Sequence, residues 1–502
     1  MTAIPDHCDL LVVGGGINGA GVARDAAGRG LSVVLCEQDD LASHTSSAST
    51  KLIHGGLRYL EQFDFSLVRK ALMEREVLIA AAPHIIRPMR FIMPHDAHLR
   101  PAWMIRAGLF LYDHLARRRY LPGSNGVDLR RHRAGHALQA RYHRGFVYSD
   151  GWADDARLVV LNALDAQERG ATILTRTRCT RLVASGGEWK ATLVKDARPS
   201  ELRCRVVVNA TGPWAARFLQ EVARLPSSHD VRLVKGSHIV VPRLFEHSFA
   251  YIFQNPDKRV LFAIPYERDF TLIGTTDLDY AGDPADPAID AGEVDYLCTM
   301  ANQYFRQPLA ARDVVWSYSG VRPLLKDSAA SAQNVTRDYA LDLSSTTPPL
   351  LSIFGGKLTV YRRLAEEALS HLARYLNPPR NEPWTARAKL PGGDLPEGQF
   401  SHLLRNVKRR YPFLPAPLRQ RLCRTYGSRV VGLLGDAQNM DALGEEVLPQ
   451  LYAAEVRYLC LFEWAQTADD ILWRRTKLGL HMPRDSAMQL DIWLAGIEQT
   501  WT

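Results

Sequence analysis

Residues 9–37 read DLLVVGGGINGAGVARDAAGRGLSVVLCE, and this stretch decides the fold. The apolar run 10–13 predicts a buried strand, the glycines after it predict a tight turn, and the alanine-rich residues that follow predict a helix. The β-branched run 31–35 predicts a second strand that ends close to Glu37. A strand, a glycine turn, a helix and a second strand in this order are typical of a dinucleotide-binding unit.

Each glycine of the G-x-G-x-x-G pattern has a physical task. Gly14 permits the tight turn, Gly16 lets backbone amides approach a pyrophosphate, and Gly19 allows the helix to pack closely on the strand. The helix N-terminus offers unpaired N–H groups and a positive dipole to the phosphates. Glu37 is placed to accept hydrogen bonds from a ribose diol, and its charge would repel a 2′-phosphate. This stretch alone leaves both NAD and FAD open.

A second glycine turn narrows the choice of cofactor. Residues 204–214, CRVVVNATGPW, predict a buried strand that ends on small residues. In a two-part dinucleotide domain, such a turn approaches the cofactor from the side opposite the first turn. Since NAD-only dehydrogenases have no need of it, the pair of turns favours FAD.

The rest of the chain predicts two further units. Residues 231–242 and 260–277 alternate apolar and polar side chains, which predicts a half-buried antiparallel sheet standing over the flavin. The Pro- and Gly-rich stretch 378–398 predicts a linker, and residues 399–502 predict a separate helical domain. Other predicted elements are helices over 71–83, 100–119, 152–170 and 456–478 and strands over 91–94 and 171–182.

Length and composition restrict the class of protein. The chain has 502 residues, enough for two or three domains, and its 46% hydrophobic and 23% charged residues are typical of a soluble globular protein. Its seven cysteines are scattered without a C-x-x-C pair, which argues against a structural metal or a disulfide framework and favours a reducing cytoplasm. We expect neither a signal peptide nor a membrane-spanning helix.

The net charge of +8 is concentrated in one segment. Between Arg100 and Arg144 there are ten arginines against two acids, so the rest of the chain is formally neutral. Residues 100–119 combine aromatic and apolar side chains with arginines at their end. Such a stretch lies on an anionic membrane surface or forms a core helix whose last turn carries dipole-stabilising arginines. The basic residues up to about 146 favour the membrane-surface interpretation over the core helix. RNA binding by this segment is a weaker alternative.

Several motifs together resemble the FAD-dependent glycerol-3-phosphate dehydrogenases, within the D-amino-acid-oxidase-like flavoproteins. They include GGGINGAG, TSSAS, KLIHGGLRYLE, ATGPW, KGSHIVVP, IGTTD, YSGVRPL, FGGKLT and ADDILWRRTK, and the resemblance covers nearly the whole chain. It implies an α/β plus α+β fold with a Rossmann-like FAD-binding domain of the glutathione-reductase/D-amino-acid-oxidase type, an antiparallel-sheet substrate domain and an all-helical C-terminal domain. The expected FAD-binding segments are about 1–60, 150–225 and 340–377, interleaved within 1–390 with substrate-domain segments 61–149 and 226–339 and followed by the helical domain 391–502.

The resemblance also implies which residues form the site. Those expected around the substrate are Arg58, Tyr59, His238, Asp277, Arg322, Lys357 and Thr359. Those expected to contact a non-covalent FAD are Gly14, Gly15, Gly16, Asn18, Gly19, Glu37, Thr45, Ser46, Ser47, Ser49, Lys51, His54, Gly56, Ala210, Thr211, Gly212, Gly355, Gly356, Lys357, Leu358 and Thr359. One position departs from the family pattern, because Val360 stands where close relatives have a threonine, and no role is carried over to it. No metal site is expected.

Cations in or beside glycine-containing turns offer the chemistry that a flavin dehydrogenase needs. They are Arg58, Lys235, His238, Arg322 and Lys357. A phosphate-bearing alcohol requires an anchor for the phosphate, a base for the hydroxyl proton and positive charge beside the reduced flavin. The resemblance implies oxidation of glycerol 3-phosphate to dihydroxyacetone phosphate by hydride transfer to FAD, with Arg322 and Arg58 on the phosphate. The base is His238 or Lys357, and the residues leave that choice open.

The resemblance implies partners as well. Electrons are expected to pass to ubiquinone or another membrane quinone, with the protein cytoplasmic and peripheral on the inner face of the cytoplasmic membrane through residues 100–146. A homodimer is a further expectation, and no nucleic-acid partner is expected. The alternatives are a glycerol-3-phosphate oxidase that uses O2, another flavin-dependent amine or alcohol oxidase, and, more remotely, an RNA-binding flavoprotein.

Overall fold

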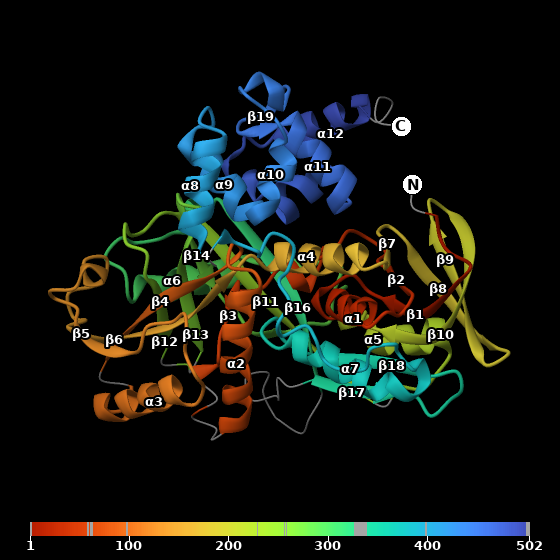
Figure 1. Ribbon diagram of the computed structural model, residues 1–502. Helices are drawn as coiled ribbons and strands as arrows, with labels where there is room; N and C mark the ends of the chain where they lie inside the picture. The colour runs from red at the N-terminus through yellow and green to blue at the C-terminus, as the bar shows by residue number, and fades with distance from the viewer. Residues whose placement is uncertain are drawn as a thin grey trace.

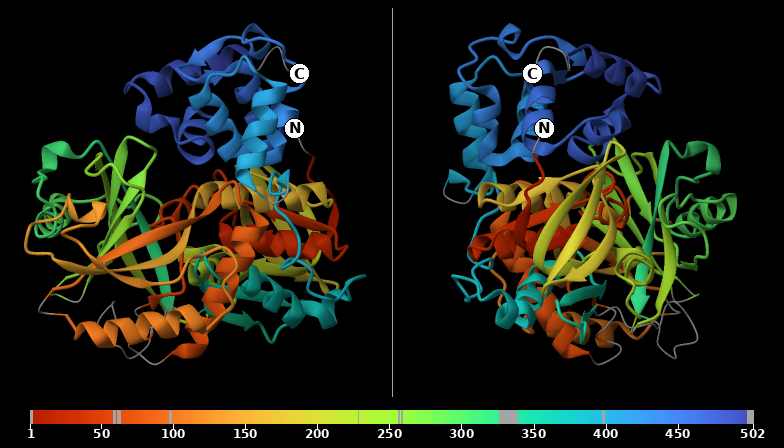
Figure 2. Two further views of the ribbon diagram at one scale, coloured as in Figure 1. Left: turned by 60° about the vertical axis from the view of Figure 1, so that its left-hand side comes forward. Right: turned by 90° about the vertical axis from the view of Figure 1, so that its right-hand side faces the viewer.

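The architecture was obtained as a computed structural model, and it has three parts (Figures 1 and 2). The structure describes residues 3–57, 60, 64–96, 99–227, 229–255, 257, 259–325, 339–396 and 399–497. Two large sheets stand side by side, and the C-terminal helices cover both from above in the view of Figure 1. The candidate site lies where turns from the two sheets meet.

The first sheet has a parallel centre built from distant parts of the chain. Its strand order is β17-β18-β10-β1-β2-β7, with a β8-β9 hairpin joined to β10. Strand β1 pairs in parallel with both β10 and β2, so the first and second glycine turns leave the same edge. The strands are β1 (His7–Val13), β2 (Val33–Cys36), β7 (Thr172–Leu174), β8 (Arg178–Ser185), β9 (Glu188–Lys195), β10 (Arg198–Asn209), β17 (Tyr339–Leu343) and β18 (Leu350–Gly355).

Three helices pack together against one face of this sheet. They are α1 (Ile17–Gly28), α4 (Asp155–Glu168) and α7 (Tyr361–Leu376). Alanines on α1, such as Ala20 and Ala23, are completely buried, and their small side chains let the neighbouring helices approach. The other face is covered partly by the short helix α5 (Ala215–Phe218), which follows the second glycine turn.

The second sheet is mostly antiparallel. Its order is β15-β11-β14-β13-β12-β4-β6-β3, with β16 paired to β11 and β5 to β6. Its elements are β3 (Leu52–Ile53), α2 (Phe65–Ala81), β4 (Ile86–Pro94), α3 (Ala102–His114), β5 (Asn125–Asp128), β6 (Arg144–Ala153), β11 (Val231–Pro242), β12 (Ala250–Gln254), β13 (Val260–Tyr266), β14 (Phe270–Gly274), β15 (Leu278–Asp279), α6 (Ala291–Asn302) and β16 (Trp316–Leu325).

The C-terminal part has its own hydrophobic core. Its elements are α8 (Phe400–Arg410), α9 (Ala416–Tyr426), α10 (Val430–Leu434), α11 (Ala453–Glu463), α12 (Ser486–Ile497) and the short pair β19 (Glu446–Leu448) and β20 (Leu451–Tyr452). The expectation of helix alone therefore needs this small correction. The domain boundaries drawn from the sequence stay a prediction.

Three predicted elements differ in extent from those observed. The strand expected over 171–182 is two strands, because Arg176 takes a left-handed φ of 52° between them. The helix expected over 456–478 ends at Glu463, and Trp464 with φ 56° reverses the chain before a π-helical turn at Asp470–Arg475. The helix expected over 100–119 ends at His114.

Buried ion pairs fix the C-terminal part to the elements of the first sheet and its helices. Arg475 donates through both Nη atoms to the Asp40 carboxylate at 2.8 Å, and both side chains are almost fully buried. Arg157 on α4 pairs with Glu463 on α11. Breaking such a buried pair leaves an uncompensated charge, at a cost of about 3–5 kcal/mol. Within the described ranges, every helix is too short or too polar to cross a bilayer.

Candidate active site

A cavity of 690 Å³ lies between the two sheets. It is lined by all three glycine turns of the first sheet and by β11 and β16 of the second. The predicted site residues on its wall are Gly14, Gly16, Asn18, Glu37, Thr45, Ser46, Ser49, His54, Ala210, Thr211, Gly212, His238, Arg322, Gly355, Gly356, Lys357, Leu358 and Thr359. Segments more than 300 residues apart in the chain therefore share one chamber.

The first glycine turn is too tight for any side chain. Gly14 has φ +113°, and a Cβ atom there would lie 2.5 Å from the Ala210 carbonyl oxygen on the second turn. At Gly19 a Cβ atom would lie 1.9 Å from the Gly14 carbonyl oxygen. Both positions need glycine because the start of α1 is pressed against two turns at once. The α1 N-terminus consequently faces the cavity with its dipole.

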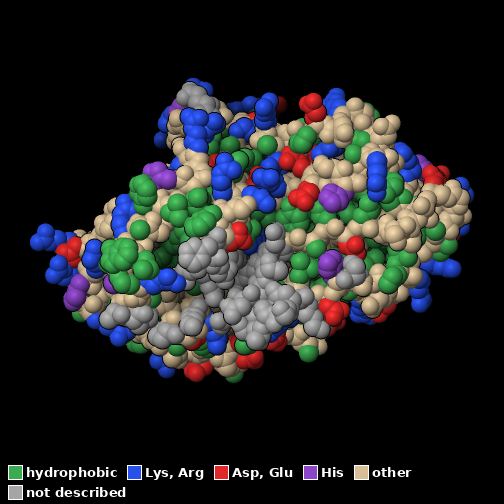
Figure 3. Space-filling model, turned by 90° about the horizontal axis from the view of Figure 1, so that it is seen from below, with side chains coloured by type: hydrophobic (Ala, Val, Ile, Leu, Met, Phe, Trp, Pro, Cys, Tyr) green, Lys and Arg blue, Asp and Glu red, His purple; other side chains and the backbone are tan. Residues whose placement is uncertain are grey.

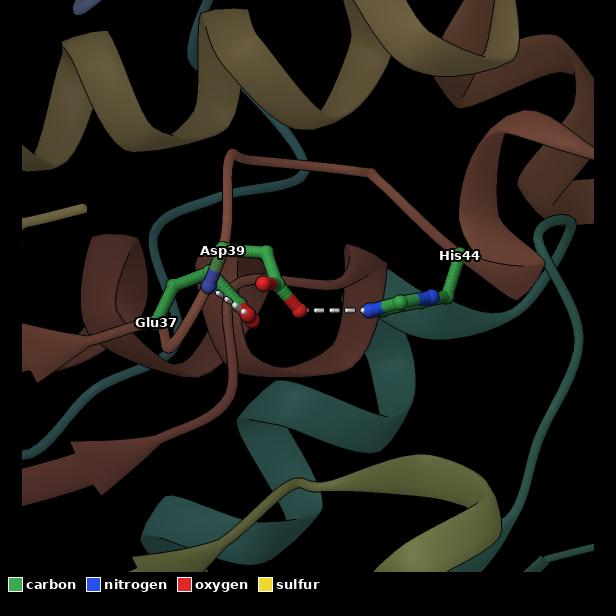
Figure 4. Close-up of side chains that lie close together, drawn as sticks. All are labelled: Glu37, Asp39 and His44. Atoms are coloured by element: carbon green, nitrogen blue, oxygen red, sulfur yellow. Dashed lines mark hydrogen bonds and ion pairs between the residues drawn. The ribbon is translucent and has the colours of Figure 1, made fainter. Parts of the chain in front are cut away.

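Glu37 lines the cavity, and its carboxylate lies close to Asp39 and His44 (Figure 4). Its oxygens accept hydrogen bonds from the backbone N–H of Gly15 at 2.6 Å and of Asp39 at 2.9 Å. Asp39 in turn bonds the ring of His44 at 2.8 Å, and that ring meets Trp214 edge to face at 4.9 Å. Burial raises the pKa of Glu37 even though both backbone donors lower it.

The second and third glycine turns follow β10 and β18. Gly212 and Gly355 both take positive φ, and Asn18 at the start of α1 donates to the Gly355 carbonyl at 3.2 Å. Beneath them, Asn209 donates to the Ser352 hydroxyl at 3.1 Å, which joins the ends of the two parallel strands. The Asn18 bond joins the first and third turns across 337 residues of sequence.

His238 is held by three neighbours. It stands on β11 opposite Gly274 of β14 and Tyr318 of β16, and the Tyr318 ring stacks on it at 4.8 Å. Its Nε2 lies 2.9 Å from the Thr50 hydroxyl. Burial, with help from the charges of Arg322 and Lys51, lowers the pKa of His238 well below its usual value. The ring is therefore neutral near pH 7 and able to accept a proton.

Arg322 on β16 presents a guanidinium group to the cavity beside His238. It is paired with Asp277 and donates from Nη2 to the Thr275 hydroxyl and the Thr276 carbonyl, each at 3.2 Å. Asp277 itself does not line the cavity. It pairs with the guanidinium of Arg322, which does line the cavity, and so orients it.

A third wall comes from Lys357 to Thr359, just after the Gly355–Gly356 turn. The Thr359 hydroxyl accepts from the His54 backbone N–H at 3.3 Å, so this wall is tied to the loop after β3. His54, Lys357 and Thr359 all line the cavity.

Several predicted residues do not line the cavity. Gly15, Gly19, Ser47, Lys51, Gly56 and Asp277 lie behind its wall. Lys51 is fully buried, and its Nζ binds Asp155 at 2.8 Å and the Ser47 carbonyl at 3.0 Å, so it braces the loop instead of facing a ligand. Arg58 and Tyr59 lie outside the described residues.

Lys235, one of the candidate cations, also points away from the cavity. Its Nζ pairs with Glu293 on α6 at 2.8 Å and donates to the Ala288 carbonyl at 2.8 Å. The other Glu293 oxygen accepts from Ser237 and Thr276. This network supports the strand ends that carry His238 and Arg322.

The sequence reasoning missed four residues that shape the site. Thr50 and Tyr318 fix the His238 ring, Thr275 holds Arg322, and Trp214 packs on His44. Tyr318, Thr275 and Trp214 fall inside motifs that mark the site, and Thr50 lies between two of them. No local spacing could single them out, since their partners lie far away in sequence.

Residues 9–362 match the family described as FAD dependent oxidoreductase, and residues 383–491 match the C-terminal domain of alpha-glycerophosphate oxidase. The chain belongs to the FAD-dependent oxidoreductases. It is 54% identical to a glycerol-3-phosphate dehydrogenase of Pseudomonas aeruginosa, over 97% of this chain and 94% of the relative.

Two further relatives help to define the group. A D-erythritol 1-phosphate dehydrogenase of Brucella abortus is 51% identical over 96% of each chain. The crystal structure of a glycerol-3-phosphate dehydrogenase from Bacillus halodurans with FAD superposes with a TM-score of 0.77 at 30% identity, covering 99% of this chain and 91% of that one. The chain is therefore similar to dehydrogenases of two different polyol phosphates.

The residues of the cavity fit the FAD that the family uses. The Gly14 turn and the α1 N-terminus are suited to a pyrophosphate, and the Glu37 carboxylate is suited to a ribose diol. At the two other glycine turns, Gly212 and Gly355 take positive φ angles and carry no side chain that could crowd a ligand. The protein is an FAD-dependent enzyme, and His238 and Arg322 line the same cavity as the glycine turns.

Proposed function

We propose that this enzyme oxidises sn-glycerol 3-phosphate to dihydroxyacetone phosphate. The observation that carries the proposal is one cavity in which a guanidinium group, Arg322, lies beside a neutral imidazole, His238, at the end away from the nucleotide-binding turn. A cation for the phosphate and a base for the hydroxyl are the groups that this substrate needs. The names of the Pseudomonas and Bacillus relatives support the same substrate.

Each residue has a role in this proposal. Arg322, oriented by Asp277, binds the phosphate, and Arg58 is proposed as its partner in the clamp. FAD, when bound in this cavity, would supply the acceptor for the hydride from C2. Lys357 and the α1 N-terminus supply positive potential in the cavity. Thr359 and Tyr59 complete the proposed substrate shell, whereas Asp277, expected there from the sequence, acts through Arg322.

His238 is the favoured base. It is neutral and buried, and its Nε2 contact with Thr50 fixes the ring, whereas the Nδ1 atom has no hydrogen-bond partner among the described residues. Lys357, which also lines the cavity, is the alternative. A His238→Asn variant that keeps more than about one tenth of the wild-type kcat would move the role to Lys357.

The decisive experiment is anaerobic bleaching of the flavin. Purified protein should show a flavin spectrum that glycerol 3-phosphate bleaches in the absence of oxygen. D-erythritol 1-phosphate is the essential comparison, because a relative of almost equal identity carries that name. Faster bleaching by D-erythritol 1-phosphate would assign the enzyme to that substrate instead. If neither compound bleaches the flavin, the protein is not a polyol phosphate dehydrogenase.

A membrane quinone is the proposed electron acceptor, with O2 as the alternative. Stopped-flow reoxidation of the reduced enzyme by air and by a soluble quinone analogue separates them. The quinone analogue should reoxidise the flavin much faster than air does. A faster reaction with air would make the enzyme an oxidase.

The proposed membrane contact is helix α3 and the basic segment that follows it. Trp103 and Phe110 are 69% and 56% exposed, whereas Leu109 and Tyr112 face the protein. This exposure supports the surface interpretation over a core helix. Figure 3 views this underside, where hydrophobic side chains and Lys or Arg side chains lie among one another. We place the enzyme on the inner, anionic face of the cytoplasmic membrane.

Vesicle flotation tests the membrane contact. The wild type should float with vesicles that contain anionic lipid, less so at high salt, and W103S/F110S should lose most of that binding. A variant with two exposed apolar residues of the C-terminal part replaced, M488S/I492S, is the matched control. Equal loss in both variants, or no dependence on anionic lipid, would contradict the proposal. The expected homodimer is tested separately by light scattering.

A further inference from the structure

A buried hydroxyl joins helix α3 to the loop at the active site. The Tyr112 hydroxyl, on the inner face of α3, accepts a hydrogen bond from the Gly55 backbone N–H at 2.8 Å. Tyr112 is only 2% exposed, and Gly55 is buried. Gly55 follows His54, which lines the cavity, and precedes Gly56, which turns the chain with φ +73°.

A buried charge pair fixes this hydroxyl. Tyr112 donates to Asp150 on β6 at 2.7 Å, and Asp150 is paired with Arg75 of α2 at 2.5 Å. All three side chains are almost fully buried. Burial and the neighbouring Asp150 raise the pKa of Tyr112, so the hydroxyl keeps its proton and donates it to the carboxylate. A lone pair of the Tyr112 oxygen is then directed to the Gly55 N–H. The position of the hydroxyl is determined by α3, which carries Tyr112, by β6 through Asp150 and by α2 through Arg75.

The loop has no room to shift at this point. A Cβ atom on Gly55 would lie 2.5 Å from Leu72 Cδ2 and 2.7 Å from the Tyr112 hydroxyl oxygen. One residue earlier, the His54 N–H is bonded to Thr359 on the cavity wall. The two successive amides of His54 and Gly55 are therefore held by two hydroxyl groups from opposite sides.

We infer that Tyr112 is a positioning residue for the substrate end of the cavity, acting through the loop 54–57 and not by contact with the substrate. The inference rests on the proposed oxidation of glycerol 3-phosphate. Without the hydroxyl, the Gly55 amide has no buried acceptor and the loop relaxes away from the Thr359 wall. Substrate binding is affected more than the chemical step, because His238 and Arg322 stand on β11 and β16 and are held by Thr50 and Thr275, not by Gly55 or Tyr112.

The test is Tyr112→Phe, compared with Tyr411→Phe. Tyr411 is an equally buried tyrosine of the C-terminal part whose hydroxyl donates to the Gly435 carbonyl at 2.7 Å. Tyr112→Phe should raise KM for glycerol 3-phosphate about 5- to 10-fold, the effect of one lost hydrogen bond, with kcat within about 2-fold and the flavin spectrum unchanged. Both variants should lower Tm by similar amounts, because each loses one buried hydrogen bond. Only Tyr112→Phe should change KM, and Tyr411→Phe should leave it unchanged.

The outcomes separate this inference from its premise. If the wild type does not turn over glycerol 3-phosphate, the proposed function fails first. If Tyr112→Phe and Tyr411→Phe have the same KM, Tyr112 is structural and the inference is overturned. Hydrogen exchange of the wild type gives a second measurement that needs no variant: the peptide containing Gly55 should exchange slowly, and rapid exchange would overturn the inference as well.

Discussion

The two ends of the cavity are built in different ways. The ribose end uses Gly14, Glu37 and His44, which come from one short stretch of chain. The substrate end joins Thr50 to His238 and Arg322 to Thr275, contacts that span 188 and 47 residues. The first can form from local sequence, whereas the second needs both sheets in place. Recognition at the ribose end is thus a local property of this chain, and recognition at the substrate end is a property of its tertiary structure.

Burial acts on both ends, with opposite electrostatic results. It raises the pKa of Glu37 and lowers the pKa of His238, so each group is driven toward its neutral form. Backbone donors counteract the shift at Glu37 and keep an acceptor available for a ligand hydroxyl. At His238 the positive charge of Arg322 reinforces the shift. One end is thereby prepared to accept hydrogen bonds and the other to accept a proton.

The largest effect is expected from Arg322→Ala. Loss of the phosphate anchor should lower kcat/KM for glycerol 3-phosphate by about 100-fold or more, since truncating one partner of a buried charge pair costs about 2–5 kcal/mol. FAD content should stay normal, because the ribose end is untouched. Arg232→Ala is the control, since Arg232 pairs with Asp279 at 2.5 Å on the same sheet but outside the cavity. An unchanged KM for Arg322→Ala would remove it from the clamp.

Glu37→Gln tests the other end. The amide keeps one acceptor oxygen but loses the charge that receives the Gly15 N–H at 2.6 Å. We expect the Kd of FAD to rise about 10-fold, corresponding to about 1.5 kcal/mol for a hydrogen bond to a charged group, with an unchanged KM for substrate once FAD is saturating. Flavin fluorescence on dilution measures the release. If the KM for substrate changes instead, the ribose end and the substrate end do not act independently, and the contrast between them is wrong.

A smaller effect is expected at Thr50, where the local and distant parts of the site meet. Thr50→Val keeps the shape but removes the hydroxyl 2.9 Å from His238 Nε2, so the imidazole is less well oriented and kcat should fall about 5-fold. FAD affinity should stay the same. Thr476→Val, which removes another buried threonine hydroxyl, is the control. An equal loss of kcat in both variants would exclude a role for Thr50 in orienting the base.

The smallest effect concerns pH. Because the folded-state pKa of His238 lies below 6.5, the ring stays deprotonated as the pH falls from 8 to 6.5, and kcat/KM should change less than about 2-fold over that range. Activity is lost only at lower pH, when the ring gains a proton. The substrate phosphate itself titrates near pH 6, so the residual activity of His238→Asn gives the reference profile. If kcat/KM of the wild type falls with decreasing pH already above pH 7, and that of His238→Asn does not, the assignment of His238 as a neutral base is contradicted.

The sequence predicted the ribose end well because each of its features is local. The glycine spacing and the distance to Glu37 place these residues on one strand-turn-helix-strand unit, and the structure has that unit. The sequence could not predict where the side chains of Lys235 and Lys51 lie, since their burial depends on Glu293 and Asp155, which lie on other elements. Nor could it find Tyr318, whose stacking on His238 follows from strand pairing.

The central sheet also has a consequence for how the protein is made. Strand β1 pairs with β10, and β10 pairs with β18, so neighbouring strands come from residues 7–13, 198–209 and 350–355. During translation, the first glycine turn emerges long before the third exists. A chain still on the ribosome therefore lacks a complete flavin pocket until residues 355–359 have been synthesised, and premature termination before that point should yield only colourless product.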